Sequence, residues 1–481
     1  MTKTVVGIYS LTSPEGELRS GDERSVIVRE AELAEALRAR GVEVVPGGAP
    51  YPEEDRVAAS SSMARRHAHT LMDFDPATVI VSTAAAPRAG DVIEGLRYLE
   101  RELKGPLRLI LHGDERIASV WERTAALAGA MRRHGYAFHL RIGNPLDPAF
   151  VDSLMPIIAF HAARREARSR ADAAIAKLKR KKIVFFGTML DRSDHDTFDP
   201  DLWYRVFGVS VEARSFSAVE ARVFEMLYGE GGEEVVDPRV VAALRRQKPL
   251  LAAPSTFAER ALQRQLTLYQ ATADILAEME AGAAVLNLGG RDVSPRPSAN
   301  LVAAWLSDRV APGGDPKDAL PAVPGPDPDG ALTGLLIHLV AAAPVASLRV
   351  VGLEGRRQTW RADAMPPSFF DAGTEVDPVA GTLRGDISVG HVATLARLAR
   401  RGSRYTLATL EATTLASRAD SPFDLAFDVT ADADEFLGLW PGSKASVIVG
   451  AHAAALVETA HRLGLGYDAV DLSGSHDRRE V

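Results

Sequence analysis

Two acidic segments of the sequence contain residue types that could hold a metal ion. The first, Asp191–Asp199, reads DRSDHDTFD and places four carboxylates and His195 within nine residues. Carboxylate oxygens are preferred ligands of hard divalent cations. The spacing does not match a calcium loop, which needs a central glycine and a distal glutamate. The alternative interpretation is a solvated loop in which Asp199 caps the helix that follows.

The second acidic segment, Pro324–Asp329, precedes a long apolar run, Ala331–Val351, that is interrupted by Pro344. The beginning of this stretch, GALTGLLIHLV, favours a helix. Asp329 can cap that helix by accepting hydrogen bonds from the free amides of its first turn. The end of the run, Val345–Val351, favours a buried strand, and a Pro-Pro-Ser turn follows it closely.

This order of an acidic loop, GALT, a helix, a strand and a Pro-Pro-Ser turn resembles the metal-site segment of the L-fucose/L-arabinose isomerase superfamily. The family's DP..W and FG motifs are matched between Asp199 and Glu212, and its TLAR motif by Thr394–Arg397. The resemblance covers nearly the whole chain. It implies a homo-oligomer, a trimer or hexamer, with clefts in which a divalent metal assists aldose–ketose exchange.

The chain departs from the family at the metal ligands. Counting from the shared motifs, the family's catalytic glutamate falls on Gly325, its strand acid near Arg349 and its histidines on Arg361 and Lys444, while Asp327 is retained. A guanidinium or an ammonium group has no acceptor atom for a cation. We therefore expect the family's metal site to be lost, and we expect no other cofactor.

The resemblance also implies that Arg349, Arg361 and Lys444 converge where the relatives hold their metal. Two interpretations follow. The three cations could bind an anionic ligand such as a phosphate, a sulfonate or a carboxylate. Alternatively, neighbouring acids could neutralise them in a structural salt-bridge network. The acids nearby in sequence are Asp327, Glu354 and Asp363.

The predicted site takes its residues from these positions. Asp327 and Lys444 are the predicted catalytic residues, Lys444 as a Schiff-base former or as a base with a lowered pKa. The predicted substrate-binding residues are Arg349, Arg361, Asp363, Ser368 and His391. A rebuilt metal site remains an alternative and would use Asp327, His391 and His452. His338 lies on the apolar helix, and we expect it to be a core residue.

The composition limits the classes of partner. The 481 residues carry a net charge of −8, which disfavours binding to nucleic acid and to anionic membrane surfaces. The chain has no cysteine, so disulfides, thiolate nucleophiles and cysteine-ligated zinc are impossible. The start, MTKTVVGIYS, lacks the pattern of a signal peptide, and polar residues interrupt the longest apolar run. We expect a cytoplasmic protein without a membrane span.

Strands alternate with helices from Thr4 onward, as in a doubly wound parallel α/β domain. A helix from Pro156 to about Lys182 is expected to connect two such units. After Phe369 short β runs recur at regular spacing. The predicted fold is therefore two Rossmann-like α/β domains followed by a β-rich domain. The predicted boundaries are 1–175, 176–355 and 356–481.

Three classes of function remain open from the sequence. The first is a divergent enzyme that isomerises, epimerises or otherwise transforms a sugar derivative, either neutral or anionic, without the family's metal. The second is a sugar-binding or regulatory relative without catalysis. The third is a conventional metal-dependent aldose–ketose isomerase. Fold alone does not decide between them.

Overall fold

The computed structural model divides the chain into two compact units. Unit 1 comprises residues 1–168, 460–468 and 475–481, and unit 2 comprises residues 169–459 and 469–474. The structure describes residues 4–9, 20–46, 68–83, 89–103, 107–117, 119–187, 199–228, 236–287, 298–401, 404–416, 424–431, 433–470 and 476–479.

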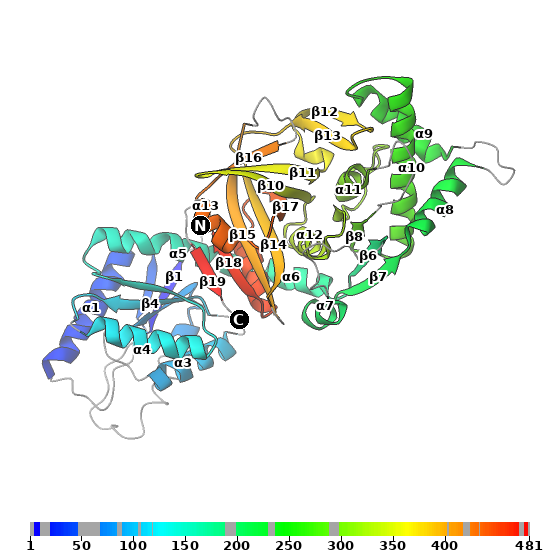
Figure 1. Cartoon of the computed structure of the whole chain (residues 1–481). Helices are drawn as coiled ribbons and strands as arrows, with labels where there is room; N and C mark the ends of the chain where they lie inside the picture. The colour runs from blue at the N-terminus through cyan, green and yellow to red at the C-terminus, as the bar shows by residue number, and fades with distance from the viewer. Residues whose placement is uncertain are drawn as a thin grey trace. The chain divides into compact units, whose positions relative to one another are not determined.

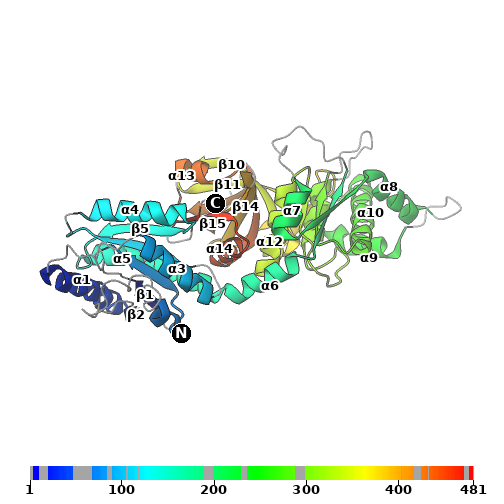
Figure 2. The same cartoon turned by 90° about the horizontal axis from the view of Figure 1, so that it is seen from below.

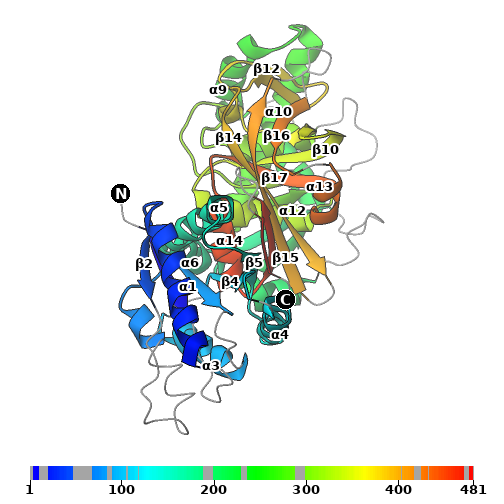
Figure 3. The same ribbon diagram turned by 90° about the vertical axis from the view of Figure 1, so that its left-hand side faces the viewer.

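Unit 1 is built on a parallel sheet of five strands in the order β2-β1-β3-β4-β5. Its elements are β1 (Val5–Tyr9), α1 (Ser20–Arg38), β2 (Glu43–Pro46), β3 (Thr78–Ser82), α3 (Ala89–Glu102), β4 (Leu109–Asp114), α4 (Val120–Arg133), β5 (Phe138–Gly143) and α5 (Pro148–Glu166). Figure 3 shows α1 beside β2.

Two apolar cores cover the two faces of this sheet. Alternate side chains of a strand point to opposite faces. Val79 and Val81 of β3 therefore pack with helices α3 and α4, while Ile80 packs with α1 and α5. Strands of a parallel sheet that is covered on both sides are buried at every position, as β3 and β4 are. Unit 1 is thus a three-layer α/β/α structure.

Unit 2 begins with a second parallel sheet, in the order β7-β6-β8-β9. Its elements are α6 (Arg168–Leu178), β6 (Lys182–Phe186), α7 (Pro200–Phe207), β7 (Ser210–Arg214), α8 (Phe216–Leu227), α9 (Pro238–Gln247), α10 (Thr256–Glu278), β8 (Ala283–Leu286), α11 (Ala299–Ser307), β9 (Ala322–Pro324) and α12 (Pro328–Ala341). Helices α8 and α9 both lie against α10 (Figure 2).

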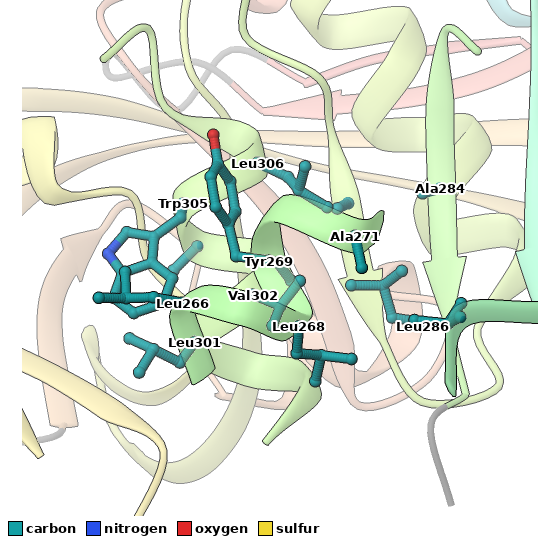
Figure 4. Close-up of a cluster of buried hydrophobic side chains, with 14 of the residues drawn as sticks. Leu266, Leu268, Tyr269, Ala271, Ala284, Leu286, Leu301, Val302, Trp305 and Leu306 are labelled. Carbon is teal, nitrogen blue, oxygen red and sulfur yellow. The ribbon is translucent and has the colours of Figure 1, made fainter. Parts of the chain in front are cut away.

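A large apolar core joins this sheet to α10 and α11. Leu286 of β8 belongs to the same buried cluster as Leu268 of α10 and Leu301 of α11 (Figure 4). Tyr269 and Trp305 meet edge to face, with ring centroids 5.9 Å apart, which is a favourable geometry for an aromatic pair. This core holds the parallel sheet in place, and the candidate site described below lies at one edge of that sheet.

The rest of unit 2 is an antiparallel β-barrel (Figure 1). Its wall consists of β10 (Ala346–Glu354), β11 (Arg357–Ala364), β14 (Val392–Arg401), β15 (Arg404–Leu415), β16 (Asp424–Val429) and β17 (Lys444–Val449). The strands follow the order β14-β17-β10-β11-β16-β15, and β15 pairs with β14 to close the ring. The remaining elements of unit 2 are β12 (Ala372–Asp377), β13 (Thr382–Asp386), α13 (Ala433–Leu439) and most of α14 (Ala453–Arg462). Strand β18 (Gly466–Val470) is divided between the two units, and β19 (His476–Arg479) belongs to unit 1.

Helix α12 connects the two sheets of unit 2. It contacts β8 and β9 of the parallel sheet and β14 and β17 of the barrel, and Figure 1 shows it between β14 and β8. Every residue from Gly330 to Ile337 is buried. A helix that is apolar all round is the kind that is enclosed on all sides, which explains the long apolar run in the sequence.

The predicted fold class is confirmed at the level of two Rossmann-like parallel sheets followed by an antiparallel β-rich barrel. Asp199 caps α7 as predicted, because its carboxylate accepts a hydrogen bond of 2.9 Å from the Leu202 amide. The rest of that acidic segment, 188–198, lies outside the described residues. In the described ranges, no helix is both long and apolar enough to cross a membrane.

The predicted single helix from Pro156 to Lys182 is wrong. Helix α5 begins earlier, at Pro148, and ends at Glu166, and a separate helix α6 follows. Asp147 starts α5, since its carboxylate accepts a hydrogen bond from the Ala149 amide and Pro148 occupies the first helical position. Proline suits that position because its missing N–H would have no partner within the helix.

Candidate functional site

The three cations predicted to converge lie side by side on the barrel wall. Arg349 of β10 is directly opposite Arg361 of β11 on one side and Lys444 of β17 on the other. Opposed residues of antiparallel strands project from the same face. The neighbouring positions Leu348 and Ala445 belong to the core inside the barrel. The row of cations is therefore on the outer face.

Each of these cations has a carboxylate partner. Arg349 lies 2.7 Å from Asp363, Arg361 lies 2.9 Å from Asp424, and Lys444 lies 3.5 Å from Asp327. The structure thus contains a salt-bridge network, which was one of the two interpretations of the sequence. One of its acids, Asp424, was not indicated by the sequence. About half of the Arg349 and Arg361 side chains remains exposed, at 52% and 50%.

Asp327 is the buried centre of this network. Its carboxylate accepts hydrogen bonds of 3.0 and 2.8 Å from the two terminal nitrogens of Arg397, and the side chains of both residues are nearly inaccessible, at 1% and 6%. Burial by itself would raise the pKa of Asp327, but Arg397 and Lys444 outweigh burial and hold it well below its ordinary value. Asp327 therefore stays ionised.

The prediction that Asp329 caps α12 is wrong. The capping residue is Asp327, whose carboxylate accepts a hydrogen bond of 3.0 Å from the Gly330 amide. Pro328 then takes the first helical position, the arrangement also seen at Asp147–Pro148 and Asp199–Pro200.

Asp329 lies in the first turn of α12 and has the opposite electrostatic character. Burial raises its pKa to about 6, and the charge of Asp327 adds to this, whereas Arg397 and a hydrogen bond from Tyr405 oppose it. The indole N–H of Trp203 donates to the same Tyr405 hydroxyl at 2.7 Å. Within the described part of the chain, the Asp329 Oδ1 atom is buried and has no hydrogen-bond partner.

These two carboxylates follow the carboxyl end of a strand in the parallel sheet. Strand β9 ends at Pro324, and Asp327 and Asp329 come directly after it. In open α/β sheets, ligands bind at the carboxyl ends of the strands. Neighbouring titratable groups whose environments push their pKa values apart are also typical of acid–base sites. This edge of the sheet is therefore the candidate functional site.

The seven predicted site residues do not all meet there. Asp327, Lys444, Arg349, Arg361 and Asp363 belong to the ion-pair network. Ser368 and His391 instead line a separate pocket with Val449, at the far end of strand β17 from Lys444. Five residues of extended strand separate the two places by about 16 Å.

The donor set does not fit the metal of the isomerases. Arg349, Arg361 and Lys444 offer no lone pair for a cation, and both oxygens of Asp327 already accept hydrogen bonds from Arg397. Across the residues that the structure describes, no group of three His, Asp or Glu side chains is placed to hold a metal ion. The alternative set of Asp327, His391 and His452 is thus not assembled. His338 is 2.8 Å from the Ala343 carbonyl oxygen.

Besides Asp424, three residues of the site were not predicted as site residues from the sequence. Arg397 was noted only as the end of a family motif, and its partner Asp327 is 70 positions away. Trp203 was noted only as part of the DP..W motif, and Tyr405 carries no local signal, because the hydrogen bond between them joins positions 202 residues apart. Comparison with models of known protein families gave no match, and comparison with curated proteins gave none either.

The Asp327–Arg397 ion pair leaves no room for a side chain at position 330. A Cβ atom at this position would overlap with the Asp327 carboxylate and lie 3.0 Å from Arg397 Nη1. We expect Gly330→Ala to lower the free energy of unfolding by about 2 kcal/mol or more, since the ion pair must shift. Gly334→Ala, one turn later, is the matched control, because its Cβ would lie 3.4 Å from Pro321 and fit. That control should change stability by less than about 1 kcal/mol. Urea denaturation followed by tryptophan fluorescence measures both, and equal losses would contradict the prediction.

The buried charge of Asp327 should matter far more than the exposed charges of the same network. Asp327→Asn leaves Arg397 buried without its hydrogen-bonded carboxylate and should cost about 3 kcal/mol of unfolding free energy. Arg349→Ala removes a half-exposed cation and should cost less than about 1 kcal/mol. Similar costs for the two variants in urea denaturation would show that the Asp327–Arg397 pair is not the dominant contact.

Asp329 should make stability depend on pH. Its pKa is higher in the folded state, so the folded protein binds more protons between about pH 4 and pH 6, and stability falls as the pH rises through this window. Asp329→Asn removes this loss. The free energy of unfolding of the variant, minus that of the unchanged protein, should therefore increase by about 2 kcal/mol from pH 4 to pH 8. Urea denaturation at both pH values measures this gain, with the exposed Asp434→Asn as control. A gain that is the same at both pH values would contradict the prediction.

Proposed function

We propose that this protein is a divergent relative of the L-fucose/L-arabinose isomerases that moves a proton on an anionic sugar derivative without the family's metal. The observation that carries the proposal is the pair Asp327 and Asp329, whose pKa values are shifted in opposite directions at the carboxyl edge of a parallel sheet. A group that must both accept and return a proton near neutral pH needs a pKa near 6 or 7, and Asp329 meets this requirement.

In the proposed reaction Asp329 is the general base. Its carboxylate takes the proton from the carbon beside the sugar carbonyl. The electrons of the broken C–H bond form a carbon–carbon double bond, and those of the carbonyl π bond move to oxygen, which gives an enediolate. Protonated Asp329 then returns the proton to the other carbon, and the hydroxyl proton moves between the two oxygens. The reaction is thus an aldose–ketose exchange that needs no oxidant.

The cations take supporting roles. The Lys444 ammonium group is partly exposed and can donate a hydrogen bond to the enediolate oxygen, which is where negative charge develops. Asp327 is a positioning residue, since it is buried and holds both Lys444 and Arg397. Arg349 and Arg361 have donors left beyond their carboxylate partners and bind the anionic substituent of the sugar.

A second function, sugar binding without catalysis, is supported by the ion pairs of the network. Arg349, Arg361 and Lys444 each already have a carboxylate partner, so the network is stable without a ligand. In either case the family resemblance implies a homo-oligomer, a trimer or hexamer, whose mass light scattering would measure.

Hydrogen exchange tests the proposal directly. The protein, treated with EDTA, is incubated in D2O with neutral aldoses, hexuronates and sugar phosphates, and proton NMR follows deuterium incorporation beside the carbonyl. We expect incorporation into at least one anionic sugar, lowered about 100-fold or more by Asp329→Asn because that variant cannot carry the proton. Asp434→Asn is the control and should leave the rate unchanged.

The other outcomes contradict the proposal in distinct ways. Incorporation that requires added Mn2+ would favour the metal-dependent isomerase. Sugar binding by calorimetry without incorporation would favour the non-catalytic relative. Incorporation that survives in Asp329→Asn would remove Asp329 from the mechanism.

A further inference from the structure

A pocket opens at one end of the barrel, where β14 begins and β17 ends. Its floor is the barrel core, and the floor residues are Met365, Ala393, Phe427 and Val447. Its volume is about 130 Å3, close to the roughly 150 Å3 of a cavity that admits one benzene ring. The mouths of β-barrels are common places for small-molecule sites.

The rim of the pocket is polar and carries one formal charge. The rim residues are Ser368, Asp371, Ser388 and His391. The Ser388 hydroxyl donates a hydrogen bond to the Asp371 carboxylate. Among the described residues that line the pocket, none is Lys or Arg. The pocket therefore combines an apolar floor with a rim that carries the Asp371 carboxylate.

Hydrogen bonds from outside the rim hold it in place. Thr414 joins the two ends of the rim segment, since its hydroxyl donates to the Ser388 carbonyl at 2.6 Å and accepts from the His391 amide at 2.9 Å. The Ser368 amide donates to the Asp308 carboxylate at 2.8 Å. A site whose polar groups are already ordered spends less conformational entropy when a ligand binds.

We propose that this pocket binds a small primary amine that carries one ring or a short branched chain. The apolar part lies on the floor between Phe427 and Val447, and the ammonium group donates to Asp371 at the rim. An amine fits this rim better than a carboxylate or phosphate, because an anion would face Asp371 without a compensating cation. The site is separate from the acid–base pair at Asp329 and does not depend on the proposed isomerase activity.

Calorimetric titration with three probes of one shape tests the proposal. The probes are benzylamine, benzyl alcohol and benzoate. We expect benzylamine to bind at least about tenfold more tightly than benzoate, because only the amine forms a charge-assisted hydrogen bond with Asp371. Asp371→Asn should weaken benzylamine about tenfold and leave benzyl alcohol unchanged. Glu375→Gln, an exposed carboxylate outside the pocket, is the matched control and should change neither.

A second variant keeps the test independent of charge. Val449 is 48% exposed at the rim, so Val449→Trp can fill the mouth without disturbing the barrel core, and it should abolish binding of all three probes. Equal affinities for benzylamine and benzoate, or benzylamine binding that persists in Val449→Trp, would overturn the proposal. The proposal would also be overturned if benzylamine gave neither heat in the titration nor a saturation-transfer signal in NMR.

Discussion

A buried ion pair between Asp327 and Arg397 holds the first turn of α12 against the barrel, and much of unit 2 depends on it. Two hydrogen bonds join the side chains, and Lys444 adds a second cation from the next strand. Asp327 also caps α12. One carboxylate therefore fixes both the start of the helix and its attachment to β14. A charge in such a place is tolerated only because it is paired and hydrogen-bonded.

The same pair explains the contrast between two carboxylates in a single helical turn. Burial disfavours ionisation of both Asp327 and Asp329. Arg397 and Lys444 reverse this effect for Asp327. For Asp329, burial and the like charge of Asp327 raise the pKa, and the attraction of Arg397 and the hydrogen bond from Tyr405 oppose them without overcoming them. Proximity to cations, more than burial, decides which acid can exchange a proton near neutral pH.

Local signals in the sequence were sufficient for much of the fold. The alternation of apolar strands and amphipathic helices predicts the parallel sheets, and the Asp199–Pro200 pair predicts the start of α7. The same signal, an acidic residue before a helix, led to the wrong cap for α12, because Asp327 and Asp329 can both accept hydrogen bonds from the first turn. The position of Pro328 separates them, since proline favours the first helical position and leaves the residue before it as the cap.

The sequence by itself determined most of the element types, the apolar character of α12, and a set of side chains at 349, 361 and 444 that has no lone pairs for a metal. Only the tertiary structure decided which acid meets which cation, which of the two aspartates has a raised pKa, and that Ser368 and His391 lie at a different end of the barrel. The reason is physical: residue types and local spacing act over a few positions, whereas ion pairing and burial depend on partners about 70 residues away that only folding brings together.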